Sequence, residues 1–112
     1  MPLFVRFTTP ARADILDILE WSADKFGDAA RTRYEALIDL AVTQIAATPD
    51  AVPARKREEI GAGLWAIHLR SIERGEVGEP RHIVFYRFDD TAVLIVRVLH
   101  ESRELASALR GY

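Results

Sequence analysis

Two stretches with the spacing of amphipathic helices follow each other with almost nothing between them, and this constrains the fold more than any other feature. Apolar side chains recur three and four positions apart in residues 10–26, and again in residues 28–47. Gly27 stands between the stretches, and glycine tolerates the left-handed backbone found at helix ends. So short a connection predicts an antiparallel helical hairpin whose two apolar stripes face a common partner.

The ends of both helices carry recognisable signals. Thr9 is predicted to cap the first helix with Pro10 at the first helical position, and Asp28 is predicted to cap the second helix, which ends near Ala47. The predicted apolar stripes are Ile15, Ile18, Leu19, Ser22 and Phe26 in the first helix and Tyr34, Leu37, Ile38, Ala41 and Ile45 in the second.

Outside the hairpin, the apolar spacing changes from helical to alternating, which is the period of a β-strand. One strand is predicted before the hairpin, and three more after a polar segment that contains the basic cluster Arg55, Lys56 and Arg57. The last three strands form two consecutive hairpins and predict an antiparallel meander. The predicted strands are residues 3–7, 64–70, 81–88 and 92–100, with loops at residues 51–63 and 73–80 and a turn at residues 89–91.

The last strand, residues 92–100, is apolar on both faces, as expected of a central strand that is covered on both sides, by the chain itself or by a partner. Its one charged residue, Arg97, needs a partner because an uncompensated buried charge is costly. We predict an ion pair with a carboxylate of the helical hairpin or of a partner protein. The tail that follows has helical spacing through Leu105 and Leu109.

These elements predict one α+β domain over residues 1–112. With no cysteine, the fold has no disulfide or thiolate metal site, and His68 and His82 stand at no ligand spacing, so no metal is expected. The net charge of −2 argues against strong direct binding of nucleic acid. No run is long and apolar enough to cross a membrane or to form a signal peptide, which predicts a cytoplasmic protein.

Four segments together resemble a known family over nearly the whole chain: ARADILDILEWSADKFGDAAR, EEIGAGLWAIHL, HIVFYRF and IVRVLH. They are similar to the ParE branch of the RelE/ParE superfamily, the toxins of bacterial type II toxin–antitoxin modules. The resemblance implies a small sheet that carries the helical hairpin on one face. It also implies a cognate ParD-like antitoxin that covers the apolar strands in a toxin–antitoxin hetero-oligomer, and no cofactor.

The resemblance leaves two mechanisms open. RelE-like toxins cleave mRNA on the ribosome, which needs a base, an acid and cations around the phosphate. The candidates for those roles are Tyr86, Arg97, His100 and a displaced Arg81, because Ile83 stands where the nuclease branch often has arginine. ParE-like toxins are described as poisoning DNA gyrase, which needs a binding surface and not a shifted pKa. The near-neutral charge favours the gyrase poison.

A third hypothesis is an inactive homologue kept as an antitoxin-binding module. Several of these residues also have a structural interpretation. His100 is expected to form hydrogen bonds at a strand end, and Tyr86 to lie in the core with its hydroxyl at the rim. The candidates for contact with the antitoxin or target are Trp21, Trp65, Arg97, His100 and Arg103.

Overall fold

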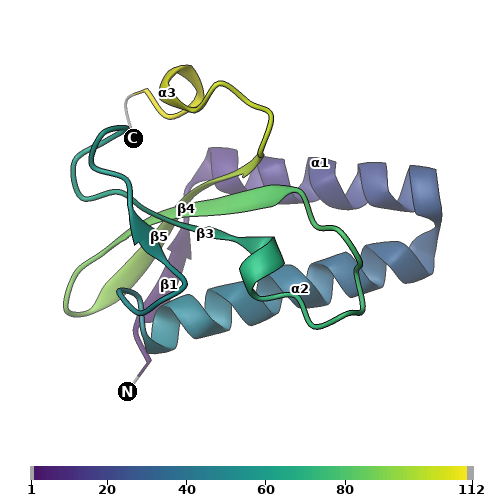
Figure 1. Cartoon of the computed structure of the whole chain (residues 1–112), viewed down its shortest axis with the longest axis horizontal. Helices are drawn as coiled ribbons and strands as arrows, with labels where there is room; N and C mark the ends of the chain where they lie inside the picture. The colour runs from purple at the N-terminus through teal and green to yellow at the C-terminus, as the bar shows by residue number, and fades with distance from the viewer. Residues whose placement is uncertain (1, 111–112) are drawn as a thin grey trace.

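The computed structural model describes residues 2–110 and places a helical hairpin against one face of a five-stranded sheet (Figure 1). The predicted α+β order of an N-terminal strand, two helices and three further long strands is confirmed. The helices are α1 (Thr9–Phe26), α2 (Asp28–Ala47) and the short α3 (Leu105–Ala108); the strands are β1 (Phe4–Phe7), β2 (Arg55–Lys56), β3 (Trp65–His68), β4 (His82–Phe88) and β5 (Ala92–His100); and a 3₁₀ turn, η1, spans Leu69–Ser71.

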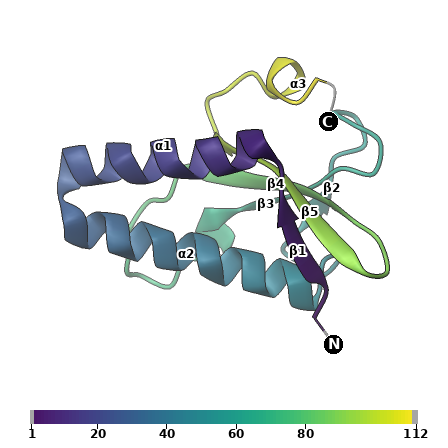
Figure 2. The ribbon, with the colours of Figure 1, turned by 180° about the vertical axis from the view of Figure 1, so that it is seen from behind.

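The helical hairpin has a connection of a single residue. Gly27 has a φ of 92°, which residues with a side chain adopt only at a cost, and its amide donates a hydrogen bond of 2.8 Å to the carbonyl of Ala23. The two helices therefore turn back on each other at once and run side by side (Figure 2). Their facing sides are buried, as the apolar spacing predicted, with Ile18, Leu37 and Ile45 in the core.

Both predicted helix caps were wrong by one residue. Thr8 caps α1: its backbone is extended, and its hydroxyl accepts the amide of Ala11 at 3.0 Å while donating to the carbonyl of Val96 at 2.7 Å. Gly27 occupies the cap position of α2, because a one-residue connection leaves no other residue for it. Asp28 lies in the first turn instead, where the helix dipole favours a carboxylate without a capping hydrogen bond.

The strand order is β1-β5-β4-β3-β2, so the predicted meander is the centre of a larger sheet. β1 joins one edge by pairing in parallel with β5, and β2 joins the other edge by pairing with β3. The segment 51–63 was predicted to be a loop throughout; β2 was missed because two residues are too few to show alternation. β3 ends at His68 rather than residue 70, and β4 begins at His82 rather than residue 81.

The sheet has apolar side chains on both faces, which confirms the interpretation of β5 as a covered central strand. One face packs against the helical hairpin through side chains such as Val93, Ile95 and Val98. On the other face, Val96 and Leu99 pack with Phe85, Leu64 and the tail residue Leu109. A shift in register next to Phe85 and Tyr86 inserts one extra residue into β5. Because Leu109 packs on this second face, the tail docks on the sheet, and α3 lies at the end of the molecule away from α2 (Figures 1 and 2).

One residue of the predicted apolar stripes does not pack. Phe26 is 67% exposed, although its spacing continues the stripe of α1. It is the last residue of α1, where the hairpin turn projects beyond the strands (Figure 2), so the core ends before it. The stripe residue Ser22, which is polar, is buried as predicted.

Candidate functional site

Tyr86, a candidate for acid–base chemistry, is sealed in the core. Its side chain is fully buried, and its hydroxyl donates a hydrogen bond of 2.5 Å to the carbonyl of Pro49 at the end of α2. Burial, and then the charge of Asp50, raises the pKa of this phenol well above its usual value. A phenol without solvent access and with a raised pKa cannot exchange a proton with a substrate near neutral pH.

Arg97 forms the ion pair that its place in an apolar strand predicted. Its guanidinium donates to both carboxylate oxygens of Asp14 on α1, at 2.7 and 2.8 Å, and a third bond of 3.0 Å reaches the carbonyl of Ala108. Asp14 also accepts the amide of Val98 at 3.0 Å. The two charged side chains are only 15% and 13% exposed. This pair joins the hairpin, the central strand and the tail, and it leaves Arg97 poorly placed for contact with a partner.

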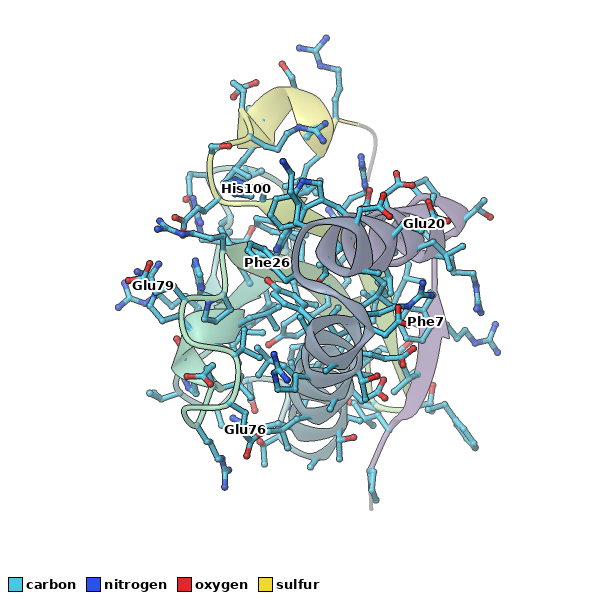
Figure 3. All side chains as sticks on the ribbon, turned by 90° about the vertical axis from the view of Figure 1, so that its right-hand side faces the viewer. Phe7, Glu20, Phe26, Glu76, Glu79 and His100 are labelled. Carbon is cyan, nitrogen blue, oxygen red and sulfur yellow. The ribbon has the colours of Figure 1, made fainter. Side chains whose placement is uncertain are left out.

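A cleft of about 710 Å³ lies between the hairpin turn and one end of the sheet. Trp21 and Phe26 line it from α1, and Tyr34 lines it from α2. The opposite wall includes Arg81, His82 and His100. Figure 3 looks toward the hairpin turn and shows Phe26, His100 and Glu79, all of which line this cleft. Residues from four separate parts of the chain therefore share one surface depression.

Two histidines and a tyrosine form the polar wall of the cleft. The hydroxyl of Tyr34 lies 2.6 Å from Nδ1 of His82, and the rings of His82 and His100 meet edge to face with centroids 5.2 Å apart. Burial, followed by the nearby charge of His100, lowers the pKa of His82 to about 4, while burial raises the pKa of Tyr34 to about 12. His82 is therefore neutral near pH 7, and its short contact with the Tyr34 hydroxyl is a hydrogen bond between two uncharged groups.

His100 ends β5 as predicted, and it is exposed. Its Nδ1 accepts the amide of Ser102 at 3.1 Å, and the Ser102 hydroxyl lies 2.8 Å from the same atom. These contacts are the hydrogen bonds expected of His100 at the strand end. They also direct its other ring nitrogen away from the turn, so one imidazole edge stays available to a partner in the cleft.

Glu101, which the sequence analysis did not select, holds the cations beside the cleft. It accepts His68 Nε2 at 2.7 Å, Arg70 at 3.0 Å and Arg81 at 3.0 Å. The hydrogen bonds from His68 and then Arg81 lower the pKa of Glu101 to about 2. Arg81 is also paired with Glu79 at 3.1 Å. A phosphate that bound Arg81 would have to compete with two carboxylates.

Of the other predicted contact residues, Trp21 and Arg103 are exposed, whereas Trp65 packs on the core. Trp21 is 54% exposed and meets Phe26 edge to face, with centroids 5.6 Å apart, so it offers an aromatic surface beside His100. Trp65 instead packs on the core against Phe88, with Lys56 over its ring. Arg103 is exposed on the turn after β5.

Sequence reasoning missed the role of Tyr34 and His82. Tyr34 follows the apolar spacing of α2, and its 48-residue separation from His82 gave no local signal. Within residues 2–110, no group of three histidine or acidic side chains is placed to hold a metal ion. No helix of that same region has the length and apolarity needed to span a membrane.

Several solved structures of toxin–antitoxin proteins have this arrangement. A structure of the chromosomal ParDE system from P. aeruginosa is similar with a TM-score of 0.69 and 15% identity, over 88% of this chain and 95% of that chain. The RelBE2 toxin–antitoxin complex from Mycobacterium tuberculosis is similar with a TM-score of 0.56 and 28% identity, over 89% and 99%. The E. coli DinJ-YafQ toxin–antitoxin complex gives a TM-score of 0.59 and 14% identity, over 99% and 100%.

The fold is the one that these toxin–antitoxin proteins share. A search of curated proteins gave no significant match. The family described as the ParE toxin of the type II toxin–antitoxin system parDE matches residues 5–105. The chain belongs to this family.

Proposed function

We propose that this protein inhibits bacterial growth by binding and poisoning DNA gyrase, in the cytoplasm, and that a cognate ParD-like antitoxin neutralises it. The main support is that two of the four side chains expected of a nuclease, Tyr86 and Arg97, do not line the cleft that holds the other two, Arg81 and His100. His82 on β4 is paired with His100 on β5, and Tyr86 lies four residues further along β4, roughly 13 Å away at about 3.3 Å per residue. The hydroxyl of Tyr86 points to Pro49. Arg97 and Arg81 are each held by carboxylates of the chain itself.

A poison needs a surface that fits its target, and the cleft beside the hairpin turn supplies one. Its exposed aromatic pair, Trp21 and Phe26, can anchor a partner, because tryptophan and other aromatic side chains dominate binding energy at protein interfaces. His100 and Arg81 add polar contacts at the same wall. We propose that this cleft contributes to target or antitoxin binding.

The test measures gyrase supercoiling with the purified protein, with and without its antitoxin. We expect inhibition with accumulation of cleaved DNA, reversed by the antitoxin. Trp21→Ala should weaken inhibition about fivefold or more, because loss of an aromatic anchor costs over about 1 kcal/mol. Leu16→Ala is the matched control, since Leu16 is another exposed apolar residue of α1 that does not line the cleft. Unchanged supercoiling would refute the proposed target.

A second candidate function is ribosome-dependent mRNA cleavage. The observation in its favour is that His82, His100 and Arg81 line one cleft, which places an imidazole edge near a cation. The same protein preparation should then cut mRNA on the ribosome, and His100→Ala should abolish the cutting. Intact mRNA alongside inhibited supercoiling supports the gyrase poison. Inactivity in both assays, together with antitoxin binding, would indicate the inactive homologue.

A further inference from the structure

Glu101 lies where three parts of the sheet meet, and its carboxylate holds a side chain from each. His68 ends β3, Arg70 lies in η1, and Arg81 directly precedes β4. The carboxylate contacts His68 Nε2 at 2.7 Å, Arg70 at 3.0 Å and Arg81 at 3.0 Å. The amide of Glu101 donates a bond of 2.8 Å to the carbonyl of Arg81, so the backbone of Glu101 is fixed beside β4.

These contacts place Glu101 between two depressions of the surface, although it lines neither of them. Arg81 belongs to the cleft at the hairpin turn. His68 and Arg70 belong to a second depression of about 370 Å³, on the β2 side of the sheet. One carboxylate therefore holds basic side chains of both. Without its charge, basic groups would follow one another from the second depression to the cleft.

Glu101 is better placed than the other acids near the cleft to compete with a phosphate for Arg81. Its side chain is only 25% exposed, and its pKa of about 2 keeps it charged at neutral pH. Glu79 also contacts Arg81, at 3.1 Å, but is 83% exposed, and Asp17 is exposed on α1. Water and salt screen exposed charges, so their attraction for a cation is weak.

Apart from its acids, the cleft has the composition of a surface for single-stranded nucleic acid. Such surfaces combine positive charge, which contacts the phosphates, with aromatic rings on which bases stack. Arg33 and Arg81 supply the charge, and Trp21 and Phe26 supply exposed rings. An acidic peptide would pair with the same arginines, but the two rings favour a nucleic acid, because every base has a flat face for stacking.

We propose that Glu101 determines the specificity of the cleft. By holding Arg81 and its neighbours, it excludes single-stranded nucleic acid and reserves the cleft for a protein partner. Replacement of this one carboxylate by an uncharged amide opens the cleft to RNA. The role of Glu101 rests on the proposed function, since the same cleft is proposed to bind the target, but RNA binding is measured without gyrase. Failure of one proposal is therefore seen separately from failure of the other.

The experiment measures the fluorescence anisotropy of a labelled single-stranded RNA of about 10 nucleotides with the full-length protein. Glu101→Gln keeps the shape of the side chain and an oxygen acceptor but removes the charge. We expect it to bind the RNA at least about tenfold more tightly than the parent protein, because a charge-assisted contact with a phosphate replaces the internal one. The slope of log affinity against log salt should steepen by about 0.7, the value for one more phosphate contact.

Glu76→Gln is the matched control. It removes the same charge from an exposed position that lines neither depression and lies well away from His100 in Figure 3. Its affinity for RNA should stay within about twofold of the parent, as expected of a distant screened charge. Arg81→Gln added to Glu101→Gln should remove most of the gain, because the cation that Glu101 releases is then absent.

Circular dichroism establishes that each variant is folded. Glu101→Asp keeps the charge but withdraws it by one methylene group, so it should bind RNA about threefold more tightly than the parent, and it serves if Glu101→Gln does not fold. In Glu101→Gln, RNA should shift the amide resonances of Arg81 and His100 and the indole resonance of Trp21. Parent-like affinity in the Glu101 variants, an equal gain in Glu76→Gln, or tighter binding of an acidic peptide than of RNA would overturn the proposal.

Discussion

Among single residues, His82 lies in an environment that disfavours its charged form. Its imidazole is held between the Tyr34 hydroxyl and the His100 ring, and its pKa is lowered to about 4. The unfolded chain therefore binds a proton, as pH falls from about 6.5 toward 4, that the folded protein does not bind. It follows that the contribution of His82 to the free energy of unfolding does not change above about pH 6.5 and becomes destabilising at lower pH.

We predict that the free energy of unfolding falls by roughly 2 kcal/mol between pH 7.5 and 4.5 through His82, allowing for its partial exposure. Urea titrations at several pH values measure this loss. His82→Asn keeps an acceptor for Tyr34 but cannot titrate, and it keeps His68 and His100 as in the parent. Its curve should therefore be flatter than that of the parent protein. Parallel pH profiles for the two proteins would show that His82 is not responsible.

Between elements, the ion pair of Arg97 and Asp14 links β5 to α1 beyond the end of β1. β1 pairs with β5 from Ala92 as far as Ile95. Beyond that point the Asp14 carboxylate, and not a neighbouring strand, accepts the amide of Val98. We predict that Asp14→Asn costs about 3 kcal/mol of unfolding free energy, since it leaves a largely buried guanidinium without its counter-charge. Asp24→Asn, at an exposed position of the same helix, should cost under about 0.5 kcal/mol in the same urea titrations. Equal losses would refute the role of the ion pair.

The tail packs on the sheet through the side chain of Leu109, in addition to the bond from Arg97 to the Ala108 carbonyl. Leu109 is buried against the sheet face opposite the hairpin, together with Phe85 and Leu99. Leu109→Ala should cost about 2 kcal/mol, the low end for a buried leucine, because a short terminal segment can adjust around the cavity. Thermal unfolding followed by circular dichroism measures this loss, with exposed Leu16→Ala as the control. A loss no greater than that of the control would mean that the tail does not stabilise the sheet.

The same elements show what local sequence can predict. The hairpin, the two-faced β5 and the ion pair of Arg97 follow from spacing, from Gly27 and from the cost of a buried charge. The parallel pairing of β1 does not follow, because four alternating residues fit any edge of the sheet. The polar wall of the cleft could not be predicted from the sequence either, since Tyr34 matches the apolar period of α2. Only the tertiary fold brings it to His82.

For the whole molecule, we propose that residues 2–110 unfold as one unit. The Arg97 pair joins α1, β5 and the tail, so none of them can detach without exposing a charge that is now compensated. We predict a single transition in which far-ultraviolet circular dichroism and tryptophan fluorescence coincide. In Trp21→Phe, the remaining fluorescence reports on Trp65 at the core, and the two probes should still give the same midpoint. Separate midpoints would indicate that the hairpin and sheet unfold independently.

The pairing of β1 with β5 has a consequence for synthesis on the ribosome. Phe4 is paired with Ala92, so the first strand is translated 88 residues before the partner that it needs. At about 5–20 residues per second, this delay lasts roughly 4–18 s. Throughout that interval the helical hairpin can form, but the sheet cannot close. A nascent chain therefore lacks the finished toxin fold until β5 has been translated.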